Sequence, residues 1–388
     1  MEQLHLRYGM NPHQGKARLY AAGKLPVKIL NGEASYINLL DAMNAFQLVR
    51  ELRSRIGEPA AASFKHVSPA GAAVYSPLSD TLARACFVED MELSPLATAY
   101  AKARGADRMS SFGDCAAFSD CVDVTAANFL QREVSDLTVA PGYDEEALAL
   151  LKKKKNGKYL ILEIDPDYTP DLIETRSIFG LTMEQERNDA IISEEVLDNI
   201  VTAERYIPGH AKKDLLLAMI TLKYTQSNSV CLALDGQTIG IGAGQQSRIH
   251  CTRLAAAKAD HWRLRHYPAA LQLKFRAGLS RAEMNNAIDG WINEDLTPAE
   301  ERLWREYFTE IPERLSKDDK THWLKGLKAV SFASDALLPF RDNIDRAARS
   351  GVKYIVQTGS SLRDNQVVEA ANEYGIVMAY SGIRLFHH

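Results

Sequence analysis

The sequence predicts an α/β fold, because short apolar runs that suit buried strands alternate along the chain with segments of helical periodicity. Residues 60–64 are small and apolar, as in a short buried strand, and Pro69 and Gly71 then break the extended run with a turn. Residues 37–52 place apolar side chains at helical spacing up to Gly57. The same succession of helix, strand and glycine turn occurs in both halves of the chain, although the sequence itself contains no visible repeat.

The first half continues with elements of the same kind. Ser94 and Pro95 suit the cap and the first position of a helix that Gly105 would end. The lysine run at residues 152–155 is interpreted as the solvated end of a helix. Further strands of the first half are expected at residues 108–114, 137–140 and 159–164.

Residues 165–186 are polar, contain proline and lack a clear period, so we expect a domain boundary there. The first domain would comprise residues 1–170 and the second residues 171–388, with an inserted helical region at about 256–327. Asp235-Gly236 predicts a hairpin turn. The four tryptophans are interpreted as core anchors of the helical region. The second half is expected to contain strands at 229–234, 237–241, 330–334, 354–357 and 376–380, and helices at 214–222, from about 247, at 341–350 and at 366–374.

Composition bounds the class of protein. A chain of 388 residues with 46% hydrophobic and 25% charged residues is typical of a globular protein with more than one core. A net charge of −4 argues against a general nucleic-acid binder. The amino terminus lacks the apolar segment of a signal peptide, and no run is long enough to span a membrane. Five cysteines without a CxxC pair indicate buried free thiols in a reducing compartment, so we expect a cytoplasmic protein.

Lys65 and His66 lie at the end of the first buried strand, where α/β proteins place ligands. An ammonium group beside an imidazole discourages its protonation, which leaves His66 able to accept a proton near neutral pH. The same ammonium group can stabilise an oxyanion that develops nearby. From these two residues alone, a surface lysine beside a histidine that packs against a strand end is the favoured interpretation.

Other motifs exclude several kinds of chemistry. The glycine-rich turn at residues 240–244, just before a helix, suits a generic anion cradle. It matches neither the dinucleotide fingerprint nor the P-loop. The sequence also lacks HExxH, the zinc-deaminase pattern and GxSxG, so neither a zinc enzyme nor a serine hydrolase is supported, and we expect no metal site of these kinds.

The segment at residues 63–74 reads SFKHVSPAGAAV and resembles the catalytic segment of the AICAR (phosphoribosylaminoimidazolecarboxamide) transformylase family. The similarity extends over essentially the whole chain, with the blocks in the order that the family has them. The further blocks are LRYGMNPHQ at residues 6–14, RGADRMSSFGD at 104–114, KYTQSNSV at 223–230, GIGAGQQSRIH at 240–250, PFRDN at 339–343 and RLFHH at 384–388.

The resemblance implies a reaction and a fold. The family transfers the formyl group of 10-formyltetrahydrofolate to the 5-amino group of AICAR, which yields FAICAR and tetrahydrofolate in the penultimate step of purine synthesis. Its fold is a duplicated pair of cytidine-deaminase-like three-layer α/β/α subdomains without zinc. The family acts as a homodimer with active sites at the interface. The resemblance also allows a structural potassium ion, for which the sequence offers no position.

Residue roles follow from the resemblance, position by position. His66 would accept the proton of the attacking amine, Lys65 would stabilise the tetrahedral intermediate, and Asn228 would orient His66 and the nucleophile. The AICAR-contacting set would be Arg7, Tyr8, Asn38, Gly113, Asp136, Arg248, Arg384 and Phe386. The folate would be held by Ile249, Leu337, Asp342, Ser361 and Leu362.

Two departures from the family pattern qualify these expectations. Most relatives carry an amino-terminal IMP cyclohydrolase domain, whereas Met1 lies six residues before Arg7, so we expect a separate protein to close the purine ring. Leu337-Leu338 stands where two aromatic residues are expected before Pro339, which makes the formyl donor the least secure assignment. A related enzyme that acts on another folate or amide, and a catalytically silent sensor of purine intermediates, are the alternatives. The intact Lys65, His66 and Asn228 argue against the sensor.

Overall fold

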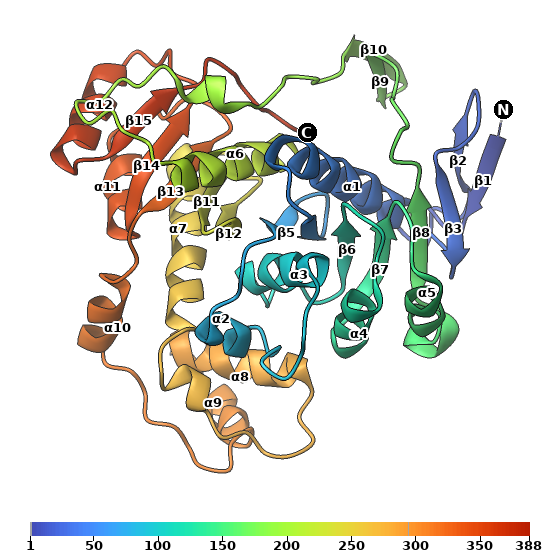
Figure 1. The fold of residues 1–388 in the computed structure, drawn as a ribbon, viewed down its shortest axis with the longest axis horizontal. Coiled ribbons are helices and arrows are strands. Elements are labelled where there is room, and N and C mark those ends of the chain that lie inside the picture. The colour runs from blue at the N-terminus through green and yellow to red at the C-terminus, as the bar shows by residue number, and fades with distance from the viewer. Residues whose placement is uncertain (1, 294) are drawn as a thin grey trace.

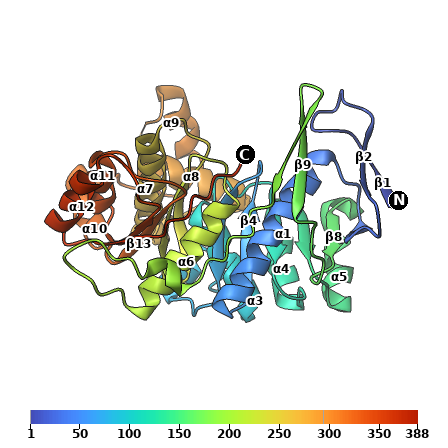
Figure 2. The same ribbon diagram turned by 90° about the horizontal axis from the view of Figure 1, so that it is seen from above.

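The computed structural model describes residues 2–293 and 295–388, and its large mixed sheet lies between two layers of helices (Figure 1). Helices α1 (Tyr36–Ile56) and α6 (Gly209–Lys223) pack side by side on one face of the sheet (Figure 2). The helices that cover the other face are α3 (Pro95–Ala106), α4 (Val124–Arg132), α5 (Glu145–Leu151), α7 (Arg248–Leu264), α11 (Asp342–Arg349) and α12 (Asp364–Glu373). The α/β class expected from the sequence is therefore confirmed.

The sheet has eleven strands in the order β15-β14-β13-β11-β12-β5-β4-β6-β7-β8-β3. Small and β-branched residues dominate these strands, and both faces are buried by helices. The strand bounds are β3 (Val27–Asn31), β4 (Ala60–Phe64), β5 (Pro69–Val74), β6 (Asp114–Phe118), β7 (Ser135–Ala140), β8 (Leu160–Ile164), β11 (Val230–Leu234), β12 (Gln237–Gly242), β13 (Val330–Ser334), β14 (Val352–Gln357) and β15 (Val377–Tyr380).

One arrangement of strands occurs on both sides of the sheet. On one side, the β4–β5 hairpin is followed by the parallel strands β6, β7 and β8, of which β6 pairs antiparallel with β4. On the other side, the β11–β12 hairpin is followed by β13, β14 and β15 in the same relation. The two sides meet where Gln237 of β12 pairs with Ala73 of β5. The hairpin predicted at Asp235-Gly236 is confirmed.

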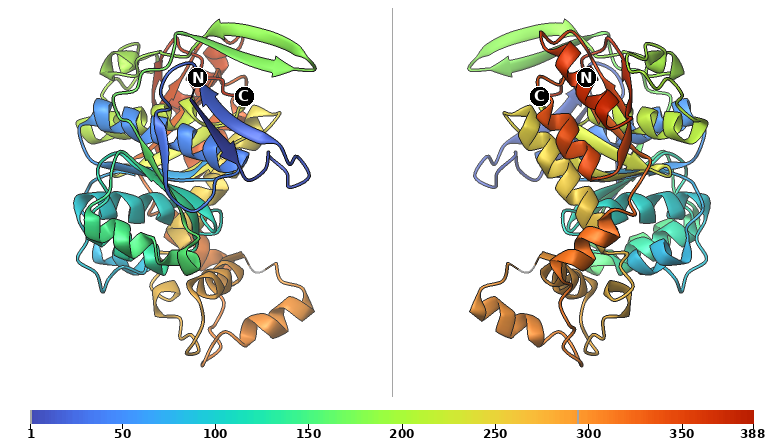
Figure 3. Two further views of the ribbon diagram at one scale, coloured as in Figure 1. Left: turned by 90° about the vertical axis from the view of Figure 1, so that its right-hand side faces the viewer. Right: turned by 90° about the vertical axis from the view of Figure 1, so that its left-hand side faces the viewer.

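Two parts of the chain project from this body. The hairpins β1 (Glu2–Leu6)–β2 (Ala17–Ala21) and β9 (Ile173–Ile178)–β10 (Leu181–Glu186) lie outside the sheet, and every residue of β9 and β10 is exposed (Figure 3). Helices α8 (Arg281–Asn293), α9 (Pro298–Arg305) and α10 (Lys317–Leu324) surround a separate core with Trp291 and Trp304 at its centre. The remaining short helices are α2 (Asp80–Ala85), η1 (Lys154–Gly157), η2 (Glu194–Leu197) and η3 (Ala270–Gln272). No helix within the described residues is long and apolar enough to cross a membrane.

The strand expected at residues 108–114 is wrong, because residues 108–113 form turns and β6 begins only at Asp114. The Arg108 guanidinium group explains the difference. It is buried and donates hydrogen bonds to Glu133 Oε1 at 2.9 Å and to Asn285 Oδ1 at 3.1 Å. The backbone turns at this point and delivers the side chain to buried partners, which an extended strand paired with β4 would not do.

The break expected at Pro69 and Gly71 is also misplaced. Both residues belong to β5, and the turn occupies residues 65–68 instead. A Cβ atom on Gly71 would lie 2.0 Å from the backbone oxygen of Ala103. Gly71 therefore serves the close approach of α3 to the sheet rather than a turn.

Two interpretations of exposure need correction. The first two lysines of the 152–155 run are exposed as expected, but Lys154 is buried and donates hydrogen bonds to the backbone oxygens of Leu130 at 2.9 Å and Glu133 at 2.6 Å. The interpretation of the whole run as a solvated helix end is therefore wrong at Lys154. All five cysteines are free thiols, and Cys121 is exposed rather than buried.

A cluster of buried charged side chains contacts strands β4 and β6 through Ser63 and Asp114. Arg104 forms ion pairs with Asp114 at 2.8 Å and with Glu133 at 3.0 Å, and Arg281 pairs with Glu133 at 2.7 Å. Ser63 of β4 donates a hydrogen bond to Asp114 Oδ2 at 2.6 Å, which connects the cluster to the strand that leads to Lys65. Burial by itself would raise the pKa of Glu133, but the guanidinium groups around it lower this pKa to about 2.

Candidate active site

The turn that joins β4 to β5 presents the Lys65-His66 pair. Lys65 N–H donates to the Ser68 oxygen at 2.9 Å, and Ser68 N–H donates back to the Lys65 oxygen at 3.3 Å. The two central residues, His66 and Val67, have φ values of 55° and 56°, which place both in the left-handed region that two-residue hairpin turns of this kind require. His66 is exposed at the tip, whereas Lys65 is half-buried.

Two contacts hold this turn in place. The buried Asp41 of α1 accepts a hydrogen bond from Val67 N–H at 2.7 Å. Lys65 Nζ donates to the backbone oxygen of Phe112 at 2.5 Å. Burial raises the pKa of Asp41, although the hydrogen bonds it accepts from the turn oppose this effect. Asp41 was not among the residues singled out from the sequence, and a carboxylate on the buried face of a helix was the signal for it.

The turn also contacts the segment that precedes β11. Gln226 N–H donates to Ser68 Oγ at 3.2 Å, across 158 positions of sequence. Two residues further on, Asn228 Nδ2 donates to the Gln245 backbone oxygen at 3.0 Å, and Arg248 Nη2 donates to Asn228 Oδ1 at 2.8 Å. The structure thus brings the region of the third predicted catalytic residue, Asn228, against the Lys65–Ser68 turn.

Asp335, directly after β13, organises this side of the site and was missed in the sequence. It is fully buried, pairs with Arg248, and accepts hydrogen bonds on Oδ2 from Ser227 Oγ at 2.6 Å and from Ser229 N–H at 2.9 Å. Its backbone oxygen accepts from Leu385 N–H at 2.8 Å, so the carboxyl-terminal segment docks on it. A carboxylate at the carboxyl end of a buried strand is the sequence signal that could have identified it.

The carboxyl-terminal residues of the predicted AICAR set therefore lie near Asn228. Ser227 N–H donates to the His387 oxygen at 3.0 Å, and His387 N–H donates to Ser227 Oγ at 3.1 Å. Arg384 and Phe386 are exposed, with the guanidinium carbon 4.7 Å from the ring centroid. They flank the docked Leu385 and are free to meet a ligand.

Three other predicted AICAR residues, Arg7, Tyr8 and Asn38, lie at the start of α1. Arg7 Nη2 donates to the Tyr8 hydroxyl at 2.7 Å, and the Tyr8 backbone accepts from Tyr36 N–H at 3.1 Å, two residues before Asn38. The Asn38 side chain accepts from Ser35 N–H at 2.9 Å and completes the cap of α1. Arg7 and Tyr8 are thus placed at the amino-terminal end of α1, the helix that carries Asp41.

Gly113 and Asp136 are neighbours in space. Gly113 follows Phe112, the residue that accepts the Lys65 hydrogen bond, and has a φ of 73°. A Cβ atom on Gly113 would lie 3.2 Å from Asp136 Oδ2, so a side chain there would crowd the carboxylate. Asp136 is exposed and pairs with Lys155.

The predicted folate residues form a separate group at the carboxyl ends of β13 and β14. Ile249 lies in the first turn of α7, Asp342 begins α11, and Leu362 is fully exposed before α12. Leu337 and Ser361 belong to the loops that follow the two strands. Within residues 2–293 and 295–388, no hydrogen bond or ion pair joins this group to Lys65 or His66.

The arrangement can perform proton transfer and charge stabilisation at one turn. The exposed His66 directly follows the half-buried Lys65 in the chain, and a carboxamide and two guanidinium groups lie on the adjoining segments. Arg248 uses Nη1 and Nη2 for Asp335, Ser229 and Asn228, and its Nε–H has no partner among the described residues. The described part of the chain contains no group of three or more His, Cys, Asp or Glu side chains that could hold a metal ion.

Comparison with known proteins places these residues in a family context. Residues 1–258 match the family described as AICARFT/IMPCHase bienzyme. Three curated relatives are each named bifunctional purine biosynthesis protein PurH: those of Magnetococcus marinus, 32% identical over 392 residues, of Ruegeria sp., 30% over 390 residues, and of Xylella fastidiosa, 31% over 396 residues. The alignments cover 99%, 99% and 100% of this chain, which spans 59%, 59% and 58% of the length of these relatives.

Proposed function

The chain belongs to the AICARFT/IMPCHase bienzyme family, and we propose that it transfers the formyl group of 10-formyltetrahydrofolate to the 5-amino group of AICAR. The products would be FAICAR and tetrahydrofolate. The observation that carries this proposal is the Lys65–Ser68 turn, which presents the exposed His66 directly after Lys65 and contacts the Gln226–Asn228 segment. Formyl transfer to a weakly nucleophilic amine needs these two kinds of group at one point.

In the proposed reaction, the amine nitrogen of AICAR attacks the formyl carbon while His66 accepts the amine proton. The carbonyl electrons move onto oxygen, and Lys65 stabilises this oxyanion. The bond between the formyl carbon and N10 of the folate then breaks, and N10 receives the proton from His66. A positioned base contributes ~10²–10⁴-fold to such a rate, and a donor to the oxyanion contributes ~10²–10³-fold.

The remaining predicted residues would bind the two substrates. Arg384, which is exposed, suits the AICAR phosphate because guanidinium groups bind phosphate with two parallel hydrogen bonds. Arg248, which donates to Asn228 with Nη2, would contact the same substrate through the donors that its protein partners leave unused. Arg7 and Asp136 would also contact AICAR. The folate would lie along the carboxyl ends of β13 and β14, where Asp342 can pair with the aminopyrimidine edge of the pterin.

We further propose that the chain is a duplicated pair of deaminase-like subdomains that acts as a homodimer. The recurrence of a hairpin followed by three parallel strands supports the duplication. The β9–β10 hairpin supports the dimer, since Phe179 is 100% exposed and Leu181 is 68% exposed at its tip, as in an arm that packs on a second copy. Light scattering should give the mass of two chains, and Phe179→Asp should weaken the dimer. A monomeric wild-type protein at micromolar concentration would remove this part of the proposal.

The assay that tests the function follows tetrahydrofolate release from purified protein with AICAR and 10-formyltetrahydrofolate, and identifies FAICAR and IMP in the product mixture. His66→Ala should lower kcat by ~10²–10⁴-fold with little change in AICAR affinity. His322→Ala, an exposed histidine on α10, is the matched control and should change nothing. A His66→Ala variant that turns over at the wild-type rate would exclude His66 as the base.

Variants of the same assay test the other expectations. IMP among the products would contradict the expectation of a separate cyclohydrolase. Repeating the reaction with potassium replaced by choline tests the structural potassium ion, and adding EDTA tests the expected independence from zinc. Turnover with a formyl donor other than the folate would favour the related-enzyme alternative.

A further inference from the structure

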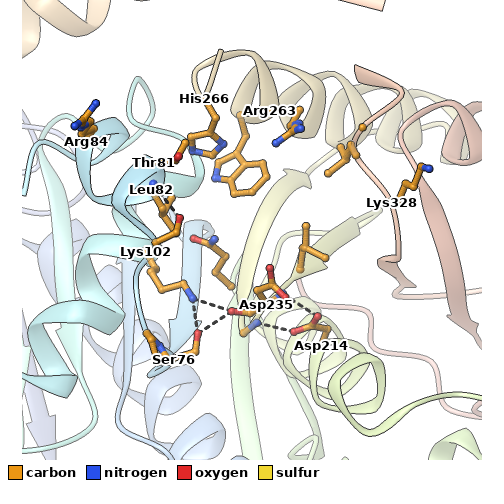
Figure 4. A pocket seen from close by; sticks show the side chains of 18 of the residues that line it. Ser76, Thr81, Leu82, Arg84, Lys102, Asp214, Asp235, Arg263, His266 and Lys328 are labelled. Atoms are coloured by element: carbon orange, nitrogen blue, oxygen red, sulfur yellow. Dashed lines mark hydrogen bonds between the residues drawn. The ribbon is translucent and has the colours of Figure 1, made fainter. Parts of the chain in front are cut away.

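A cavity lies at the opposite end of the strands from the Lys65–Ser68 turn, and Figure 4 shows it from close by. It is bounded by Ser76 just after β5, by the Asp235-Gly236 turn between β11 and β12, and by the carboxyl end of α7. We call it the Gln237 pocket, after a residue of its wall. Its volume of about 900 Å³ lies within the range of pockets that hold small molecules. No residue of the candidate active site lines it.

The Gln237 pocket carries an excess of positive charge. Its basic residues are Arg84, Lys102, Lys213, Arg263 and Lys328, and none of them forms an ion pair within the described residues. Figure 4 shows Arg84, Arg263 and Lys328 around the cavity. Of the two acidic residues, Asp214 already accepts hydrogen bonds from Asp235 N–H at 2.9 Å and Gly236 N–H at 2.7 Å. An anionic group would therefore meet five basic side chains against the two carboxylates of Asp214 and Asp235.

Lys102 is the most deeply buried of these basic residues. Its side chain is 1% exposed, and Nζ donates to the Ser76 hydroxyl and to the Asp235 backbone oxygen at 2.8 Å, neither of which carries a charge (Figure 4). Burial lowers the pKa of Lys102 to about 8. The Asp235 and Asp214 carboxylates oppose this shift, but neither forms an ion pair with the buried ammonium group among the described residues, so a bound anion would supply a direct ionic partner.

Unpartnered polar atoms in the wall point to a ligand that also makes directional hydrogen bonds. Gln237 is 1% exposed, and its Oε1 has no hydrogen-bond donor. Trp262 is 7% exposed, and its Nε1–H has no acceptor. Arg263, a third residue of the lining, has no acceptor for its Nε–H. Buried polar atoms are almost always hydrogen-bonded in native proteins, so three unpartnered atoms in the lining of one pocket need partners. A heterocycle whose edge carries both an N–H group and a ring nitrogen would pair with Gln237 and Trp262.

The pocket also offers a stacking surface. The guanidinium carbon of Arg263 lies 4.2 Å from the ring centroid of Trp323, and Trp323 Nε1–H donates to the Arg263 backbone oxygen at 2.8 Å. A guanidinium group that stacks on one ring can stack on a second planar ring with its opposite face. A planar ring is thus accommodated beside the cations.

We propose that the Gln237 pocket binds a phosphorylated planar heterocycle of the nucleoside monophosphate class. The lysine and arginine side chains would bind the phosphate. Gln237 would accept a hydrogen bond from the edge of the heterocycle, and Trp262 would donate one to it. The pocket is separate from the Lys65–Ser68 turn, so the proposal does not depend on formyl transfer.

Calorimetric titration of the full chain with AMP tests the proposal, with adenosine and ribose 5-phosphate as partial probes. AMP should bind, and each partial probe should bind at least about tenfold more weakly, because each lacks one of the two recognised features. Lys328→Glu and Gln237→Met should each raise the Kd for AMP by about tenfold or more. Lys24→Glu makes the same charge change at an exposed lysine far from the pocket lining and should leave the Kd within about twofold.

Three results would overturn the proposal. One is the absence of AMP binding at millimolar concentration. Another is AMP binding that survives Lys328→Glu and Gln237→Met but disappears in Arg248→Met, which would place the nucleotide in the candidate active site. The last is a Lys328→Glu variant whose oligomeric mass differs from that of the wild type, which would assign the pocket to an interface between copies. Because Lys328 is exposed and unpaired, its variant tests the pocket even if Gln237→Met does not fold.

Discussion

Replacing Asp335 by asparagine should destabilise the protein strongly, because the change leaves the buried Arg248 without its counter-charge. The Asp335 side chain is fully buried, and the Arg248 side chain is 7% exposed. The new amide group would also present N–H donors to the hydroxyl and N–H donors of Ser227 and Ser229, which now donate to Oδ2. Removing one partner of a buried ion pair typically costs about 3–5 kcal/mol, and we expect Asp335→Asn to lie in this range.

Urea unfolding followed by far-UV circular dichroism measures the effect as a change in the free energy of unfolding. Asp90→Asn is the matched control, because Asp90 pairs with Arg132 at 2.8 Å while 60% of its side chain is exposed. Exposed ion pairs contribute about 0–1 kcal/mol, so this control should be nearly neutral. An Asp335→Asn variant that is no less stable than Asp90→Asn would refute the assignment of Asp335 as the organiser of the site.

A double-mutant cycle separates the ion pair from the other hydrogen bonds of Asp335. Arg248→Met alone leaves Asp335 unpaired, whereas the double variant removes both charges. If the pair is coupled as the structure indicates, the double variant should be more stable than the sum of the two single changes predicts, by about 1–3 kcal/mol. Additive effects would mean that the guanidinium group and the carboxylate act independently.

Three further predictions concern the surroundings of the site. Gly71→Ala places a Cβ atom 2.0 Å from a backbone oxygen of α3 and should destabilise by about 1–3 kcal/mol or more, whereas Gly15→Ala, with open space around it, should stay within about 0.5 kcal/mol in the same urea assay. The pKa of Glu133 is lowered from 4.5 to about 2, so its ionised form stabilises the protein above pH 4.5, and this stabilisation of about 3 kcal/mol is lost as the pH falls towards 2. Glu133→Gln should remove this pH dependence from the free energy of unfolding. A pH dependence unchanged in the variant would argue against Glu133 as its source. Asp41→Ala should free the Val67 N–H and lower kcat at least about tenfold, while Asp41→Asn, whose amide oxygen can still accept that bond, should restore most of it; equal losses in both variants would show that the carboxylate charge matters more than the hydrogen bond.

The sequence by itself determined the elements whose signals are local. Asp235-Gly236 predicted its hairpin because only a few residue types favour two consecutive positive φ angles. The strand at residues 60–64 and the helix up to Gly57 were likewise legible from apolar spacing and a helix-ending glycine. Lys65 and His66 suggested a pair for proton transfer by their types, but the family resemblance of residues 63–74 was needed to favour this over a structural role, and the assignment stays a prediction.

The tertiary structure alone decided how distant segments complete the site. His66 and Val67 form a turn of the same kind as the Asp-Gly hairpin although neither is a usual turn residue, because Asp41 binds the Val67 N–H from α1. Asn228 comes near this turn only through the Gln226–Ser68 contact. Residues 108–113 form turns instead of the predicted strand because the Arg108 guanidinium group has a buried partner far along the chain, Asn285.

The physical reason is that buried polar groups must find partners wherever the fold places them. Backbone propensity depends on neighbours in sequence, so it can be read from a single segment. The hydrogen-bond and ion-pair partners of Asp335 and Glu133 are side chains that only the packing of the sheet and helices brings together. For this reason the elements were legible from the sequence, and the carboxylates that hold the site together were not.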